Sequence, residues 1–146
     1  MTEQTTPAIV SLYEQDETAW LEQTAGLVAQ GRFAEIDHHH LSEYLADMAR
    51  RDKREVLSRL VVLLAHLLKW EHQPQQRTRS WEATILHQRQ ELQDLLESGT
   101  LRNHAREVLA KAYERAVKQA ALETGMAEGA FPAACPWPLE ELAPEE

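Results

Sequence analysis

Residues 56–70 (VLSRLVVLLAHLLKW) are the most apolar stretch of the chain and constrain its fold more than any other segment. Wound as a helix, the stretch is apolar on more than half of its circumference, although Arg59 and His66 interrupt its leucine-rich part. Such a helix needs neighbours on several sides, so the sequence predicts that it lies at the centre of a helical bundle. No segment approaches the roughly 20 apolar residues that span a bilayer, so no membrane partner is expected.

The rest of the 146 residues also carries helical rather than strand patterns. β-branched residues are scattered, and no alternating run of apolar and polar residues reaches the length of a strand. The length suits one domain with one core. We therefore predict an all-α fold, a single-domain helical bundle of about five helices with a proline-punctuated C-terminal tail. Its expected parts are a flexible N-terminus (1–10), a single all-helical domain (11–142) and a loose acidic tail (143–146).

Capping residues, glycines and prolines predict where the helices end. The helix that starts at Asp37 either continues through the charged stretch RRDKRE (50–55) or breaks there, and the pattern leaves both open. The last long helix carries a contact stripe of alanines, and Phe131 and Trp137 attach the tail to the bundle. The expected boundaries are a first helix from Asp16 to Gln30 that buries Trp20, Leu27 and Val28 and stops at Gly31, a break at Pro74, a helix over 78–97, and a last helix capped by Thr100 that ends at Gly125.

The net charge of −9 is unevenly distributed along the chain. Residues 1–37 carry a net −6, residues 125–146 carry −5, and the middle carries +2. This overall acidity argues against non-specific binding to nucleic acid, which depends on neutralising phosphates. Two basic clusters, one at residues 50–54 and one at Arg77 and Arg79, are interpreted as solvated helix faces.

Cys135 is the one cysteine, so the chain forms no intrachain disulfide and suits a reducing compartment. The first ten residues contain neither a basic run nor a long apolar stretch, so we do not expect a signal peptide. We therefore expect a cytoplasmic location.

Three consecutive histidines, His38, His39 and His40, are the most obvious candidate metal ligands. Consecutive residues of a helix point about 100° apart, so the three rings cannot face one ion. A tetrahedral site would need, for example, His39 with Glu43 and ligands from another helix. We favour an exposed first turn and expect no metal.

A polar corner lies between the central helix and the one that follows it. It could hold an anion, a phosphate or a base through guanidinium groups and stacked rings. Alternatively, an arginine caps the carbonyl groups at the end of the central helix while the tryptophans fill the seam between helices, and this interpretation is favoured because cations are common at helix C-termini. The residues of this candidate site are Arg59, His66, Trp70, Gln73, Arg77 and Trp81.

No motif for covalent or cofactor chemistry is present in the sequence. Cys135 lies in a proline-rich tail, and neither a G-x-S-x-G turn nor a glycine-rich phosphate loop occurs. Glu43, Asp47 and Asp52 lie near one helical face, but the paired Glu-x-x-His signature of helical di-metal proteins is missing. We therefore assign no catalytic residues and expect no cofactor.

Several motifs together resemble the bacterial domain of unknown function 29 family over about residues 11–142. These motifs are Tyr13-Glu14-x-Asp16, Trp20, Asp37 before Leu41, the run SRLVVLLAHLLKW, Gln73-Pro74, Arg77, Ser80-Trp81, Thr84-Ile85, Arg89, Tyr113, Ala116, Ala120, Glu123-Thr124, Phe131-Pro132 and Cys135-Pro136-Trp137.

The resemblance implies an all-helical fold and no established activity, cofactor or catalytic residues. Two departures stand out. The chain has Glu43-Tyr44 where the family usually has a Glu-Glu pair, which weakens a carboxylate site. It has Ser98-Gly99-Thr100-Leu101 in place of Ser-Pro-Ser-Leu, which preserves a capping hydroxyl. For some members the resemblance also implies toxin–antitoxin-like gene pairs.

Three functional hypotheses follow. The leading one is a small cytoplasmic helical protein that binds a protein partner, because a compact scaffold is present and a catalytic constellation is not. The second is a nucleic-acid-acting module or toxin component that uses the Arg/His/Trp corner. The third and weakest is a metal-dependent helical enzyme. A homo-oligomer remains open under each of them.

Overall fold

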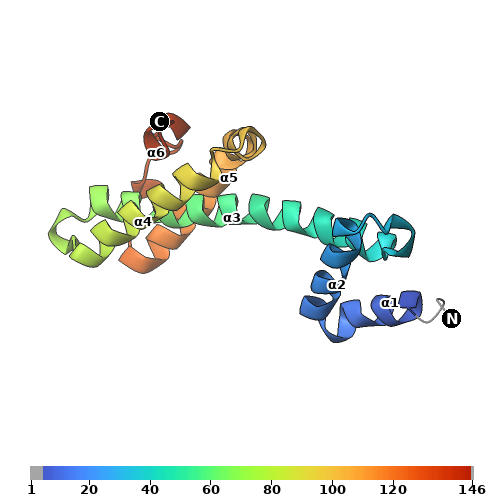
Figure 1. Ribbon diagram of the computed structural model, residues 1–146. Helices are drawn as coiled ribbons and strands as arrows, with labels where there is room; N and C mark the ends of the chain where they lie inside the picture. Colours follow the sequence, from blue (N-terminus) through green and yellow to red (C-terminus); the bar gives the residue numbers. More distant parts are fainter. Residues whose placement is uncertain (1–4, 146) are drawn as a thin grey trace. The chain divides into compact units, whose positions relative to one another are not determined.

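A computed structural model describes residues 5–145 of the chain and the side chains of residues 9–145. Its regular elements are helices, and the described residues contain no strand (Figure 1). The predicted all-α helical fold is therefore confirmed. No helix in this part of the chain combines the length and the apolar character needed to cross a membrane. The elements are α1 (Thr5–Gln15), α2 (Glu17–Ala29), the 3-10 turn η2 (Phe33–Glu35), α3 (His38–His72), η3 (Pro74–Gln76), α4 (Arg79–Leu95), α5 (Gly99–Thr124), η4 (Glu128–Ala130) and α6 (Leu139–Leu142).

The contacts of the chain divide into two compact units, an N-terminal unit that ends at Arg50 and a C-terminal unit that begins at Arg51. The boundary falls inside α3, which answers the question that the sequence left open, because the helix continues through residues 50–55. No residue from 45 to 55 is buried. Side-chain pairs one turn apart, Asp47 with Arg50 and Glu55 with Arg59, support this solvated stretch. The single domain over 11–142 stays a prediction.

The N-terminal unit is built around the buried side chains of Ile9, Trp20, Leu27 and Ile36. It contains a helix that the sequence analysis does not predict, α1, which packs beside α2 (Figure 1). The expected flexible segment 1–10 is corrected accordingly, since residues 5–10 belong to α1, whereas residues 1–4 lie outside the described part. An 11-residue helix is marginal in isolation, so α1 depends on tertiary packing that no local pattern reveals.

The helix predicted from Asp16 to Gln30 is α2, and its predicted ends are confirmed. Asp16 caps α2 by accepting a hydrogen bond from the Ala19 amide at 3.1 Å, and Gly31 follows the helix with a φ of +71°. The prediction that Val28 is buried is wrong, because its side chain is exposed. Leu27 belongs to the core and Val28 does not, because consecutive residues of a helix point about 100° apart.

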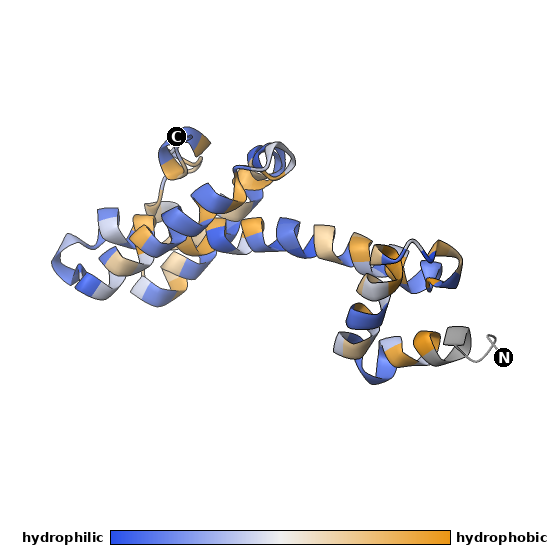
Figure 2. Ribbon diagram, viewed as in Figure 1, coloured by the Kyte–Doolittle hydropathy of each residue, from blue (hydrophilic) through white to orange (hydrophobic). Residues whose placement is uncertain are grey.

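In the C-terminal unit, the second half of α3 is the centre of the core, as predicted. α4 lies beside it (Figure 1), and the guanidinium of Arg59 donates to the Gln88 amide oxygen at 3.1 Å between the two helices. α5 supplies the expected alanine stripe, whose members are fully buried. Figure 2 shows hydrophobic stretches alternating with hydrophilic ones along these helices, as amphipathic packing requires. The fully buried core residues of α3 and α5 include Val56, Leu60, Leu63, Leu64, Leu68, Ala105, Ala112, Ala116 and Ala120.

Two predictions about the end of the chain need correction. Ser98, not Thr100, caps α5, since its hydroxyl accepts from the Leu101 amide at 3.2 Å. The tail expected to be loose from residue 143 is attached, because Ala143 is fully buried and its carbonyl accepts from Arg102 at 3.1 Å. The buried side chain of Phe131 joins the same core, with Trp137 packed against it, as predicted. Glu146 lies outside the described residues.

Two glycines of the N-terminal unit allow a matched test of backbone geometry. An added methyl group meets open space at both Gly26 and Gly31, but only Gly31 has a positive φ. We expect Gly26→Ala to raise the free energy of unfolding by about 0.5–1 kcal/mol, because alanine favours the helix. Gly31→Ala should lower it by about 1–2 kcal/mol because of left-handed strain. Urea denaturation measures both changes. Equal effects at the two positions would contradict the left-handed backbone geometry assigned to Gly31.

Candidate functional site

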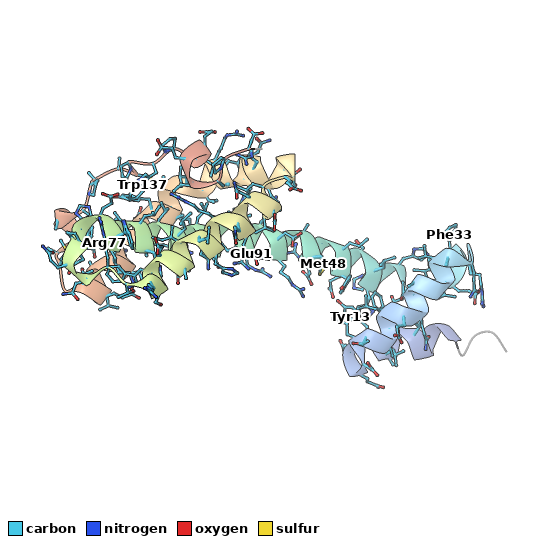
Figure 3. All side chains as sticks on the ribbon, turned by 60° about the vertical axis from the view of Figure 1, so that its left-hand side comes forward. Tyr13, Phe33, Met48, Arg77, Glu91 and Trp137 are labelled. Atoms are coloured by element: carbon cyan, nitrogen blue, oxygen red, sulfur yellow. The ribbon has the colours of Figure 1, made fainter. Side chains whose placement is uncertain are left out.

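The turn from α3 to α4 unites two of the predicted corner residues, Trp70 and Arg77 (Arg77 is labelled in Figure 3). The Nε of Arg77 donates to the Trp70 carbonyl oxygen at 2.8 Å, and its guanidinium lies 4.6 Å from the centre of the Trp70 ring. The arginine thus satisfies a carbonyl group at the end of α3 and stacks on the indole at the same time. This is the capping arrangement that the sequence analysis favours for the corner.

The other corner residues have separate partners. His66 donates from Nδ1 to the Val62 carbonyl at 2.8 Å within α3, and the Gln73 amide contacts the Met126 sulfur at 3.1 Å. Arg59 binds Glu55 at 2.7 Å in addition to its contact with α4. The structure therefore does not gather the six corner residues around one space. Their use as a binding site stays a hypothesis.

The sequence analysis missed Lys69, the most tightly enclosed charged group beside the corner. Its Nζ lies 2.7 Å from Oε1 of Glu123 on α5 and 5.0 Å from the centre of the Trp81 ring. The lysine side chain is 9 % exposed, whereas that of Glu123 is 40 % exposed. The ammonium is thus held between one carboxylate and the face of one indole, which explains why Trp81 is kept half-buried.

The hydrogen bond from Lys69 holds the pKa of the Glu123 carboxyl below its ordinary value of 4.5, although burial acts in the opposite direction. The Gln119 amide donates to the second carboxylate oxygen at 3.3 Å and adds to this effect. A lysine inside the apolar run HLLKW was a signal that a buried ion pair was needed. Its partner, 54 residues away along the chain, had no local signal.

A second polar cluster lies in the N-terminal unit around the buried carboxylate of Asp37. This carboxylate accepts from Nε1 of Trp20 at 3.2 Å, from Nδ1 of His40 at 2.7 Å and from the His40 amide at 3.3 Å. Burial alone would raise the pKa of Asp37, but these three donors outweigh it and leave the pKa below 3.8. Asp37 therefore begins α3 as predicted and also fixes the Trp20 ring in the core.

The three histidines at the start of α3 have different surroundings. His38 donates from Nε2 to the Phe33 carbonyl at 2.7 Å, whereas His40 is bonded to Asp37 and stacks on the Tyr13 ring with centroids 4.2 Å apart. His39 is exposed and touches His40 edge-on. Across the part of the chain that the structure covers, no three metal-binding side chains converge. The absence of a metal remains an expectation.

His40 is an imidazole oriented by a carboxylate, which is the arrangement that prepares a general base. The neighbouring hydroxyl belongs to Tyr13, and burial, followed by the charge of Glu43, raises its pKa. A raised pKa makes this phenol a poor nucleophile. The cluster is chemically suited to fixing α1, α2 and the start of α3, and we assign it no reaction.

Three hollows on the surface of the C-terminal unit are large enough to consider as sites. One of about 740 Å³ lies against Arg102 and the tail, and its walls are largely polar. A second of about 730 Å³ adjoins Tyr113 and Cys135, and burial raises the pKa of the Cys135 thiol, which keeps it protonated. The third, of about 830 Å³, is an apolar groove bordered by α3, α4 and the tail. We call it the indole groove, after Trp70 and Trp137 in its walls.

Comparison with known proteins identifies one family. The family model described as Domain of unknown function DUF29 matches residues 12–146. Neither the curated proteins nor the solved structures that were compared with the chain include a match. The match covers nearly the range over which the sequence resembles this family.

The Lys69–Glu123 pair makes a specific prediction for stability. Glu123→Ala leaves a buried ammonium without its carboxylate, so the free energy of unfolding should fall by about 2–3 kcal/mol. Glu107→Ala, on the same helix but with an exposed carboxylate, should change it by less than about 0.5 kcal/mol. Urea denaturation measures both. The double variant Lys69→Met with Glu123→Ala should be more stable than Glu123→Ala alone. If the double variant is not more stable, the buried ion pair is contradicted.

The Asp37 cluster predicts a pH dependence. Because the pKa of Asp37 is lowered on folding, its stabilisation is complete above the ordinary value of 3.8 and is lost as the pH falls through the folded value. Asp37→Asn should therefore destabilise the N-terminal unit by about 2 kcal/mol at pH 7, and its difference from the natural chain should shrink below pH 3.8. The Trp20 indole NMR signal reports unfolding of this unit. Asp47→Asn, an exposed control, should have little effect at either pH.

Proposed function

The chain belongs to the family described as Domain of unknown function DUF29, and for this member we propose that it acts by binding a partner protein through the surface around Phe33. The observation that carries the proposal is the number of large apolar side chains that the N-terminal unit exposes. Four of the six exposed large hydrophobic side chains among the described residues lie there, as many as the unit buries in its core. They are Val10, Val28, Phe33 and Leu45.

Phe33 is the largest of these side chains and is 58 % exposed. It begins η2, the turn between α2 and α3 (Figure 3). Its carbonyl accepts from His38 at 2.7 Å and from the Ile36 amide at 3.3 Å, and Arg32 and Glu35 form an ion pair at 2.5 Å across the turn. A ring presented by a turn held in this way loses little freedom on binding, and buried aromatic rings are the usual anchors of interfaces.

The charge of the unit indicates what kind of surface it fits. Residues 1–37 carry a net −6, so the partner should place an apolar pocket for Phe33 among lysine or arginine side chains. The same charge repels nucleic acid, and this favours the protein partner over the rival hypothesis of a nucleic-acid-acting module. We place this interaction in the cytoplasm, on the ground of the lone cysteine.

Phe33→Ser tests the proposal in the full chain. The tagged protein is used to recover partners from the native lysate, and Phe33→Ser should reduce recovery of the specific partner roughly tenfold or more. Leu122→Ser, which alters an 87 % exposed leucine on α5, is the matched control and should leave recovery unchanged. Thermal denaturation should show both variants folded, since neither side chain belongs to the core.

Three results would overturn the proposal. One is equal recovery with Phe33→Ser and the natural chain, and another is equal loss with both variants. The third is a Phe33-dependent dimer in light scattering, which would identify the partner as a second copy whose basic residues 50–54 meet the acidic unit. Binding of RNA at low salt that survives Phe33→Ser would favour the nucleic-acid hypothesis instead.

A further inference from the structure

The indole groove of the C-terminal unit contains an arginine without a partner. Arg89 on α4 lines the groove and is half-buried, and its Nε is enclosed with no acceptor within hydrogen-bonding distance. None of the ion pairs or hydrogen bonds among residues 5–145 involves this guanidinium. Six other arginines, by contrast, have partners: Arg32, Arg50, Arg59, Arg77, Arg102 and Arg106. Solvent does not reach the Nε, so an acceptor from outside the chain would bond to the terminal nitrogens of this partly dehydrated guanidinium.

Most of the remaining lining surface of the groove is apolar, although Glu71, Arg79, Glu82 and Glu141 also line it. Among its apolar lining residues, Leu67 is buried, Ile85 and the two indoles of Trp70 and Trp137 are half-buried, and Leu86 is exposed. Arg77 occupies one face of the Trp70 ring, so the indole is already fixed in orientation. The volume of about 830 Å³ falls in the range of pockets that enclose small molecules. Apolar walls and one half-buried cation, with the other charged side chains exposed, favour an amphipathic anion as the ligand.

We propose that the indole groove binds a small aromatic carboxylic acid, whose ring packs against Trp70 and Trp137 and whose carboxylate pairs with Arg89. A planar guanidinium binds a carboxylate through two parallel hydrogen bonds, which accounts for the choice of a carboxylate. A flat ring gains more from two indoles than an alkyl chain does, which accounts for the aromatic body. This site is independent of the partner surface around Phe33.

Three glutamates in the same walls, Glu71, Glu82 and Glu141, raise the alternative of a cationic ligand. All three are exposed to solvent, so water already hydrates their carboxylates and a ligand cation would gain little from them. Arg89 is half-buried and lacks an acceptor, so the carboxylate of a ligand has more to gain there. Arg79, also on α4, lines the groove as a second positively charged residue, and its side chain is exposed.

Three naphthalene probes of nearly equal size and different charge test the proposal. They are 2-naphthoate, its neutral amide 2-naphthamide and the cation 2-naphthylmethylammonium, each titrated into the full chain. The chain has four tryptophans, and each gives its own indole N–H signal in NMR spectra of ¹⁵N-labelled protein. We expect 2-naphthoate to shift the Trp70 and Trp137 signals and to leave those of Trp20 and Trp81 in place. The amide and the cation should each bind at least roughly tenfold more weakly than 2-naphthoate.

Variants of the groove complete the test. Arg89→Gln should weaken 2-naphthoate roughly tenfold or more, and Arg115→Gln, which alters an exposed arginine on α5 outside the groove, should not. Because Arg89 is half-buried, Ala83→Trp gives a second route, since it fills the groove from an exposed position of α4 and should abolish binding. Equal affinity for acid and amide, tighter binding of the cation, unmoved Trp70 and Trp137 signals, or full binding by Ala83→Trp would each overturn the proposal.

Discussion

The second half of α3 has to be covered by other elements of the C-terminal unit, and the rest of that unit follows from this requirement. Leu60, Leu63, Leu64 and Leu68 are fully buried, so neighbours must approach on several sides. α5 meets the need with alanines, which allow close approach, and Phe131, Leu139 and Leu142 close a further side. Even the final residues contribute, since the Ala143 carbonyl accepts a hydrogen bond from the buried guanidinium of Arg102. In this unit, two of the enclosed charged side chains join separate segments: Lys69 joins α3 to α5, and Arg102 joins α5 to the tail.

Structural pairing also accounts for most of the polar residues that the sequence offers as candidates for a functional site. Arg77 satisfies the end of α3, Lys69 joins α3 to α5 through Glu123, and Asp37 joins Trp20 to the start of α3. Each of these groups is paired, and each pairing stabilises a turn or a contact between helices. A side chain with such a partner is a weak candidate for catalysis. The groups left for recognition are those without partners, chiefly Phe33 in one unit and Arg89 in the other.

The two proposed surfaces differ in kind, and their locations follow from the physics of each unit. The N-terminal unit is too small to bury all of its large apolar side chains, so it presents an aromatic anchor amid acidic charge. The C-terminal unit has a large core, and its groove arises where the tail crosses α3 and α4 with tryptophans in the walls. A protein interface suits the first, and a small molecule suits the second.

The sequence by itself determined the helices with strong periodicity or clear caps, because these depend on residues a few positions apart. The all-α class, Asp16 and Asp37 as starts, Gly31 and Gly125 as ends and the alanine stripe of α5 are local properties. Only the tertiary structure decided the presence of α1, the continuity of α3 and the burial of Ala143, since each depends on packing or solvation around the segment. The partners of the polar side chains belong to the same group. Lys69 meets a carboxylate 54 residues away. Of the corner residues, Trp70 and Arg77 contact each other, whereas Arg59, His66 and Gln73 each have a partner elsewhere in three dimensions.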